Sequence, residues 1–300
     1  MAGAVLLMAG PLQAQPRGEG PLILRLPASA RSAALGTLGL SITDADALFA
    51  NPAMLPSVRG TAISVHRYGG AATAGSMATT ATVGPVTLGI GAQTLQYQAA
   101  AGASYADVVA AGATHLADGG PVAAASTAFT IGAARTLGSW KVGASVKVLD
   151  ERLGAQHDGT LAVDLGGQRT LGPGVLAVVA HNLGVGPRIG GVTGTLPRRL
   201  GVGYGLSRPI APAWDLGGQM ALTMEGDWFV RPAGGAELTY VPIDGVALTV
   251  RSGVRLPRER DESLVTGGLG VQIDHLLIDY ALEPMRGGRP ASHRIGIRLR

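Results

Sequence analysis

The feature that most constrains this chain is a two-residue alternation of apolar with small or charged side chains. Residues 140–148 place Trp140, Val142, Ala144, Val146 and Val148 on one face and Lys141, Gly143, Ser145 and Lys147 on the other. The same alternation recurs in four further segments, at residues 200–206, 246–256, 276–283 and 294–299. Because successive side chains of a β-strand point to opposite faces, each segment is predicted to be a strand.

The non-apolar face of these strands carries charges, which decides between two kinds of β-protein. Charges occur on that face in four of the five segments, at Lys141, Lys147, Arg251, Arg255, Asp279, Glu283, Arg294 and Arg298. A soluble β-sandwich buries its apolar face and turns its polar face to water. A membrane barrel does the reverse, with apolar residues toward lipid and polar residues toward the lumen. The alternation therefore favours a barrel.

Composition points the same way. Hydrophobic residues make up 46% of the chain and charged residues 15%, where roughly a quarter is usual in soluble proteins. This chain is too apolar for disorder and too poor in charge for an ordinary soluble surface. The longest uncharged stretch, from Tyr68 to Tyr105, is rich in Gly and Thr and contains Pro85, so a spanning helix is not predicted there. A closed β-barrel is the other structure that satisfies every backbone group in lipid.

We predict an all-β fold: a transmembrane, outer-membrane antiparallel β-barrel of about 14 strands, preceded by a short N-terminal segment without strands. Twelve strands would fit nearly as well. Residues 1–14 are apolar and end in Ala14, as expected of a signal peptide. Residues 15–60 do not alternate and include a short helix over 46–50, and residues 61–300 form the barrel. Residues 15–60 lie either in the periplasm or in the lumen as a plug, or hatch. The predicted strands lie near 61–67, 75–83, 86–97, 123–137, 139–151, 159–169, 174–183, 197–208, 213–225, 231–241, 245–256, 263–273, 275–283 and 292–300.

Two N-terminal segments, residues 30–36 (ARSAALG) and 44–55 (DADALFANPAML), carry a family likeness. They resemble the N-terminal signature of the PorV/PorQ family, within the FadL-like superfamily of outer-membrane barrels. Weaker likenesses lie in residues 141–147, 181–184, 197–203 and 293–297. The resemblance implies a 14-stranded barrel with the N-terminal segment folded into the lumen. The hatch residues that it carries over are Asp44, Asp46, Asn51, Pro52 and Ala53.

The charges predicted to face the lumen allow two interpretations. They are Lys141, Lys147, Asp164, Arg251, Arg255, Asp279, Glu283, Arg294 and Arg298. They could line a path for anionic solutes. The interpretation that we favour is that they pair across strands, or with the hatch acids Asp44 and Asp46, and so fix the hatch.

The sequence predicts no disulfide, metal site, catalytic centre or nucleic-acid-binding surface. The chain has no cysteine, which excludes disulfides, thiolate metal sites and a lipid anchor on Cys. None of the six histidines has a metal-ligand spacing, so no metal or cofactor is expected. Ser145 and Ser252 are the candidate nucleophiles of a membrane enzyme, but neither has a His nearby in sequence, and we expect no enzyme. The cations are scattered and aromatic residues make up only 4%, which argues against nucleic-acid binding.

Two functions remain. The resemblance implies a monomeric protein of the outer membrane of a Gram-negative-type bacterium, in contact with outer-membrane lipid. A PorV/PorQ-type protein would assist protein secretion or surface attachment, with secreted proteins or secretion-system components as partners. The alternative is a FadL-like passive transporter of hydrophobic small molecules. A transporter needs an apolar pocket in the lumen and a break in a strand for lateral exit.

Overall fold

The structure is a computed structural model that describes residues 20–36, 39–40, 45–69, 72–111, 119–226, 228–258 and 262–299. Fourteen antiparallel strands form one closed barrel in the order β1-β16-β15-β14-β13-β12-β11-β10-β7-β6-β5-β4-β3-β2. The predicted barrel and its fourteen strands are confirmed, and the twelve-strand alternative is wrong. Two further short strands, β8 and β9, form a separate hairpin.

The barrel strands are β1 (Gly60–Tyr68), β2 (Ala72–Val83), β3 (Val86–Ala99), β4 (Val122–Leu137), β5 (Trp140–Leu153), β6 (Gln156–Leu171), β7 (Gly174–Gly184), β10 (Arg199–Ala211), β11 (Trp214–Glu225), β12 (Val230–Ile243), β13 (Val246–Arg255), β14 (Val265–Ile273), β15 (Leu276–Glu283) and β16 (Ser292–Leu299). The small hairpin is β8 (Arg188–Ile189) and β9 (Val192–Thr193). The helices are η1 (Leu22–Arg25), α1 (Ala30–Ala34), α2 (Ala47–Ala50), η2 (Pro52–Ser57) and α3 (Tyr105–Ala111). The sequence predicts one short helix before the barrel, whereas the structure has four.

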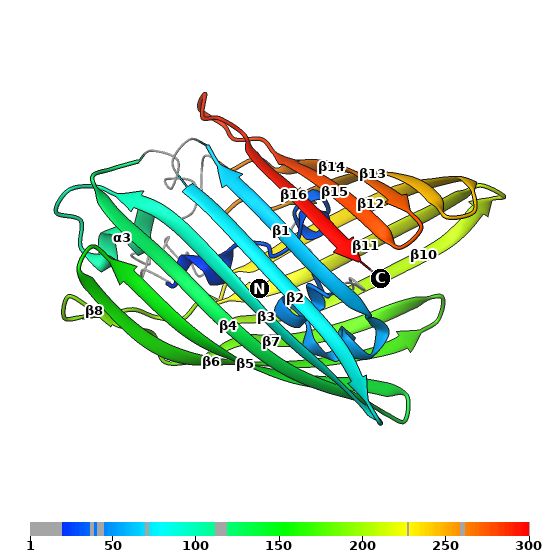
Figure 1. Cartoon of the computed structure of the whole chain (residues 1–300), viewed down its shortest axis with the longest axis horizontal. Helices are drawn as coiled ribbons and strands as arrows, with labels where there is room; N and C mark the ends of the chain where they lie inside the picture. Colours follow the sequence, from blue (N-terminus) through cyan, green and yellow to red (C-terminus); the bar gives the residue numbers. More distant parts are fainter. Residues whose placement is uncertain are drawn as a thin grey trace, which may run out of the picture.

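The two ends of the barrel differ. At one end, six hairpins close through two-residue turns, at 84–85, 138–139, 172–173, 212–213, 244–245 and 274–275. We call this the short-turn end. Gly84, Gly138 and Gly172 have φ values of +57°, +58° and +58°, which other residues rarely adopt. The opposite end carries α3 and the β8–β9 hairpin, and we call it the long-loop end (Figure 1).

The alternation appears directly in the exposure of the strands. Outward side chains are apolar and uncovered: Ile131 is 67% exposed and Val65 is 61% exposed. Inward side chains on the same barrel are buried and include Lys147, Asp164, Arg251, Asp279 and Arg298. A continuous apolar exterior of this kind is stable in lipid, because exposing so much apolar surface to water is unfavourable. Among the described residues, no helix is long and apolar enough to cross a membrane.

The described residues between 20 and 58 lie inside the ring of strands, as the blue segment of Figure 1 shows. Helix α1 packs against β13, β14, β15 and β16, and η2 packs against β3, β4, β5 and β6. The four short helices therefore contact opposite walls of the lumen. We refer to residues 20–58 as the luminal segment. The predicted signal peptide, residues 1–14, lies outside the described residues.

Candidate functional site: the barrel lumen

The luminal segment runs from one end of the barrel to the other. The backbone N–H of Gly20 donates to the carbonyl of Thr195, at the long-loop end, over 3.0 Å. Lys141 Nζ, two residues after the 138–139 turn, donates to Ser57 Oγ near the end of the luminal segment. The segment is thus anchored to the wall at both ends of the lumen.

The Asn-Pro-Ala step of the sequence is a tight fit against the wall. Asn51 is fully buried, and its Oδ1 accepts from the Ala53 backbone N–H at 3.1 Å while its Nδ2 donates to the Leu40 carbonyl at 3.3 Å. Asn at the N-cap followed by Pro is a favourable start for a helical turn, which here is η2. A Cβ on the facing residues Gly143 or Gly166 would overlap Pro52 or Asn51. Glycine in the wall is what lets this step approach.

The predicted hatch acids are placed differently from each other. Asp46 is 4% exposed and stands at the start of α2, bordering a cavity. Asp44 lies outside the described residues. In the ion-pair networks described below, the luminal segment contributes a cation, Arg31, to the pairing.

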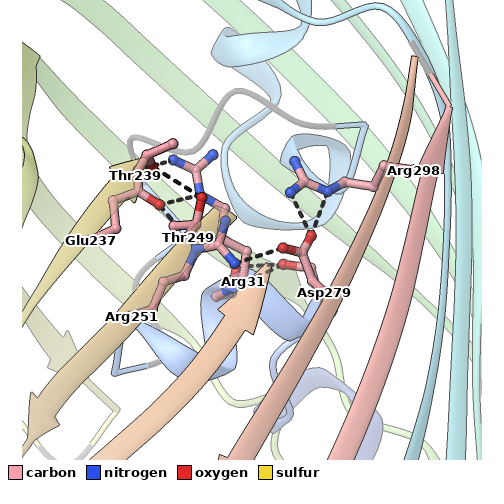
Figure 2. A network of polar contacts seen from close by, with 9 residues as sticks. Arg31, Glu237, Thr239, Thr249, Arg251, Asp279 and Arg298 are labelled. Carbon is pink, nitrogen blue, oxygen red and sulfur yellow. Dashed lines mark hydrogen bonds and ion pairs between the residues drawn. The ribbon is translucent and has the colours of Figure 1, made fainter. Parts of the chain in front are cut away.

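The first network joins the luminal segment to four strands (Figure 2). Arg251 on β13 donates to Glu237 on β12 at 3.0 Å and to Asp279 on β15 at 2.6 Å. Arg298 on β16 donates to the same Asp279 at 2.8 Å. Arg31 of α1 completes the network by binding Glu237. Because Asp279 is 2% exposed and shared by two guanidinium groups, its charge is compensated inside the barrel.

A second network holds the backbone of the luminal segment. Three arginines, on β10, in the loop after β13 and on β16, donate to nearly consecutive carbonyls: Arg199 to Leu24 at 3.0 Å, Arg258 to Arg25 at 3.1 Å, and Arg294 to Pro27. Two of these arginines have further partners in the wall, since Arg294 also binds His66 and Arg258 binds Glu225. Nearby, Arg255 pairs with Glu283 at 2.8 Å. These arginines hold the luminal segment through hydrogen bonds to its backbone carbonyls, which do not depend on its side chains.

A third network lies at an irregularity in the wall. The pairing of β6 with β7 shifts register between Val163 and Leu165, and Asn182 of β7 has a φ of +55°. Asp164 lies at this bulge and contacts Lys147 at 2.7 Å, His181 Nδ1 at 3.1 Å and the Asn182 backbone N–H at 2.8 Å. Lys147 also donates to Asn182 Oδ1 at 2.9 Å. The side chains supply hydrogen bonds where the ladder is interrupted.

The long-loop half of the lumen contains an apolar cluster, which we call the apolar chamber. Leu22, Ile23 and Leu24 of η1 fill it. Its walls come from inward positions of the barrel and from α3 and the loops, namely Tyr68, Leu95, Tyr97, Tyr105, Val108, Val109, Leu149, Leu153, Ile189 and Leu196. Glu151 is the buried carboxyl group beside it and accepts from Ser126 and from Tyr97 Oη at 3.4 Å. Burial raises the pKa of the Tyr105 phenol on α3, outside the barrel wall.

Three cavities beside the described part of the luminal segment are small. Two cavities of about 90 Å³ each border Leu26 and Pro27, and both are lined by Arg25, Arg199 and Arg258. A third of about 130 Å³ lies beside Asp279 and Arg298, toward the short-turn end. Pockets for small organic ligands usually measure roughly 300–1,000 Å³. A ligand of that size fits none of these three cavities as they stand. Among the described residues, no group of three or more His, Cys, Asp or Glu side chains is arranged to hold a metal ion.

The structure brings together every predicted lumen-facing charge with a partner. Sequence reasoning missed Arg31, Glu237, Glu151, Arg199 and Arg258, which are as central as those predicted. Glu237 lies on the inward face of a strand that the sequence predicts, so reading the alternation through residues 231–241 would have found it. Arg31 lies on a segment without alternation, and no local signal marks it.

The fold defines the class of protein: a closed fourteen-stranded barrel of the outer-membrane type, with an apolar exterior, a charged lumen and an internal N-terminal segment. No family model matches the chain, and no curated protein matches its sequence. Its fold is similar to that of the Pseudomonas putida toluene transporter TodX, with a TM-score of 0.57, 12% identity, and coverage of 90% of this chain and 96% of that one.

Two further solved structures have the same fold. The Ralstonia pickettii toluene transporter TbuX gives a TM-score of 0.57 at 13% identity and covers 95% of this chain and 99% of its own. The monoaromatic hydrocarbon channel CymD gives 0.54 at 10% identity, with 89% and 96% covered. These likenesses show that the chain shares its fold with these transporters and channels. They do not show the narrower PorV/PorQ relationship.

Proposed function

We propose that the protein is a passive transporter of hydrophobic small molecules across the outer membrane, acting as a monomer and without catalysis. The observation that carries the proposal is the apolar chamber. The inner wall of a water-filled porin is polar. Here inward positions such as Leu95, Tyr97 and Leu149 are instead apolar or aromatic, in the half of the lumen nearer the long loops. The fold shared with toluene transporters also supports the proposal that the protein transports hydrophobic molecules.

In this proposal residues 15–60 act as a hatch. Leu22, Ile23 and Leu24 occupy the chamber that an apolar compound would use, and the two cavities that border Leu26 and Pro27 are smaller than usual ligand pockets. In the proposed transport η1 leaves the chamber, which breaks the hydrogen bonds from Arg199 to Leu24 and from Arg258 to Arg25. Helix α1 stays held through Arg31. The β-ladder is continuous round the barrel, and the bulge at Asp164 and Asn182 is its one register shift away from a hairpin turn. We take this bulge as the candidate for a lateral exit.

A role in secretion or surface attachment, as for PorV/PorQ-type proteins, is the second candidate. It rests on the likeness of residues 30–36 and 44–55. The described residues of these segments are largely buried in the lumen, and Asn51 and Ala53 pack against the wall. Their packing role accounts for the motif without an external partner, so we rank this function second.

Uptake by intact cells separates the candidates. We expect expression in a host without its own hydrocarbon channel to raise uptake of radiolabelled toluene. A Leu22→Ala/Ile23→Ala/Leu24→Ala variant should raise it further, since η1 then fills the chamber less well. A matched control is Leu248→Ala/Val250→Ala/Val254→Ala on the outer face of β13, away from the bulge. Equal uptake with and without the protein would refute transport, whereas recovery of secreted proteins with the barrel from its native membrane would favour the second candidate.

A further inference from the structure

The outer face of the barrel carries a basic patch at the short-turn end. Arg135 on β4, Arg169 on β6 and Arg208 on β10 all occupy outward positions of the alternation. Arg135 and Arg208 are exposed and Arg169 is partly exposed. Strands β4, β5, β6, β7 and β10 are consecutive neighbours in the wall (Figure 1), so the three arginines share one side of the barrel.

A repeated turn sequence sets the depth of these arginines. Residues 135–138 and 169–172 both read Arg-Thr-Leu-Gly, and each Gly begins a two-residue turn at a φ of +58°. Each Arg therefore lies three residues before its turn, and Arg208 lies four residues before the 212–213 turn. At about 3.3 Å per residue along a tilted strand, all three lie about 10 Å from the turns. That is the depth of one bilayer interface.

The neighbours of the patch are those of a lipid interface. Arg169 lies over the ring of Trp140, with 5.4 Å from the guanidinium carbon to the ring centroid. Tyr204 on β10 donates to the Leu171 carbonyl at 3.0 Å, and Leu137, Leu206 and Ile210 beside the patch are exposed apolar residues. Aromatic and apolar side chains of this kind mark the boundary between acyl chains and headgroups.

No carboxylate on this face neutralises the patch. All residues of β4–β7, β10 and β11 are described, and their outward positions hold a single carboxylate, Asp150. Asp150 lies at the long-loop end, where it pairs with Arg152 at 2.8 Å. The inner cation Lys141 points into the lumen, toward Ser57. Three positive charges therefore face the membrane together.

We infer that Arg135, Arg169 and Arg208 form a binding site for anionic phospholipid, phosphatidylglycerol or cardiolipin, in the leaflet at the short-turn end. Strands lie about 4.8 Å apart, so arginines two strands apart can bracket one phosphate-bearing headgroup. Guanidinium groups form paired hydrogen bonds with phosphate oxygens, and the surrounding apolar side chains accept the acyl chains. The short turns of such barrels face the periplasm, whose leaflet consists of phospholipid.

Trp140 provides a built-in reporter. We would place a Trp214→Phe/Trp228→Phe protein, which keeps Trp140, in bilayers of phosphatidylcholine with dibrominated phosphatidylglycerol, and measure fluorescence quenching. The expected result is a binding constant for phosphatidylglycerol roughly five-fold or more above that for phosphatidylcholine. Arg135→Gln/Arg208→Gln, which leaves the Arg169–Trp140 contact in place, should bring the ratio close to one. Arg67→Gln/Arg152→Gln, two outward arginines at the long-loop end, should leave it unchanged.

Equal quenching of the parent protein by dibrominated phosphatidylglycerol and by dibrominated phosphatidylcholine would overturn the inference. A ratio of binding constants that Arg135→Gln/Arg208→Gln leaves unchanged would do the same. Assembly of each variant is checked by its faster migration before heating. If the double variant does not assemble, the lipid preference of the parent protein is measured at about 1 M NaCl instead. At that salt concentration the Debye length is about 3 Å, so the attraction between the arginines and the anionic headgroup is screened. A preference that persists in the parent at that salt concentration would also overturn the inference. The inference does not depend on the transport proposal.

Discussion

Glycine on the inner wall determines how closely the luminal segment approaches the strands. Gly143 on β5 and Gly166 on β6 face Pro52 and Asn51, where any larger side chain would overlap the segment. Asn51 in turn uses both ends of its amide inside the segment. The wall and the segment are thus complementary at the level of single atoms.

Gly166→Ala should therefore weaken the docking of η2. The added methyl group would displace Asn51, and overpacking of this kind costs about 1–3 kcal/mol. The free energy of unfolding in lipid vesicles, followed by Trp fluorescence in urea, measures the cost. Gly218→Ala on β11 is the matched control, because no heavy atom lies within 4 Å of its added Cβ. Equal stability of the two variants would contradict the close fit.

Asp279→Asn tests the shared carboxylate. The substitution leaves Arg251 and Arg298 buried without their common anion, and breaking a buried pair costs about 3–5 kcal/mol. The control is Asp150→Asn, whose partner Arg152 has a side chain that is 63% exposed, and which should cost at most about 1 kcal/mol. Both values come from the same urea titration. A cost for Asp279→Asn no larger than that of the control would mean that the network does not stabilise the fold.

Among the elements, α3 is held over the apolar chamber by a polar cap. Ser104 donates from its backbone N–H at 2.9 Å and from its Oγ at 2.7 Å to Asp107, and the Asp107 N–H returns a bond to Ser104 Oγ at 3.3 Å. This reciprocal arrangement is a capping box. It positions Tyr105, Val108 and Val109 against η1.

The cap makes the stability of α3 depend on pH. The hydrogen bonds from Ser104 lower the pKa of the Asp107 carboxyl below its ordinary value. The stabilisation is therefore complete above about pH 4 and is lost as pH falls through the lowered pKa. We expect the hydrogen-exchange protection factors of α3 to fall on acidification in that window. Asp107→Asn should show weaker protection without the pH dependence, and an unchanged profile would exclude the cap as its cause.

Sequence alone predicts the strands far better than the luminal segment, for a physical reason. Alternation is a local property, so the bounds of β5 and β16 follow from residues that are neighbours in the chain. Helices as short as α1 and η1 have no stability of their own and form because the lumen holds them. The Arg31–Glu237 contact joins residues 206 positions apart, which no local pattern records. The strands of the wall could be predicted from the sequence, whereas the packing of the luminal segment inside the lumen could not.

For the whole molecule, the lumen divides into an apolar part and a charged part. The apolar chamber lies along β3–β5 at the long-loop half, whereas the network of Arg251 and Asp279 lies along β12–β16. The luminal segment passes between them and is bound by both. Such a division allows one part of the segment to leave while charged contacts retain the other.

Deleting residues 15–55 should open the barrel. The deletion removes η1, α1 and α2 with most of η2, so the lumen would fill with water along its charged side. We expect a large, steady single-channel conductance in planar bilayers where the full-length protein gives little. Gly218→Ala in the full-length chain serves as the control for insertion. Conductance that is the same with and without the segment would refute its role as a hatch.

The seam of the barrel links this closure to biogenesis. Strand β1 pairs with β2 on one side and with β16, the last strand, on the other. Helix α1 docks on β13–β16, which are synthesised after every other part of the wall. The luminal segment precedes every strand of the wall in the chain, yet α1 can dock only when the final hairpins have formed. In an incompletely assembled barrel α1 would lack its docking strands, so a docked luminal segment indicates that the barrel is complete.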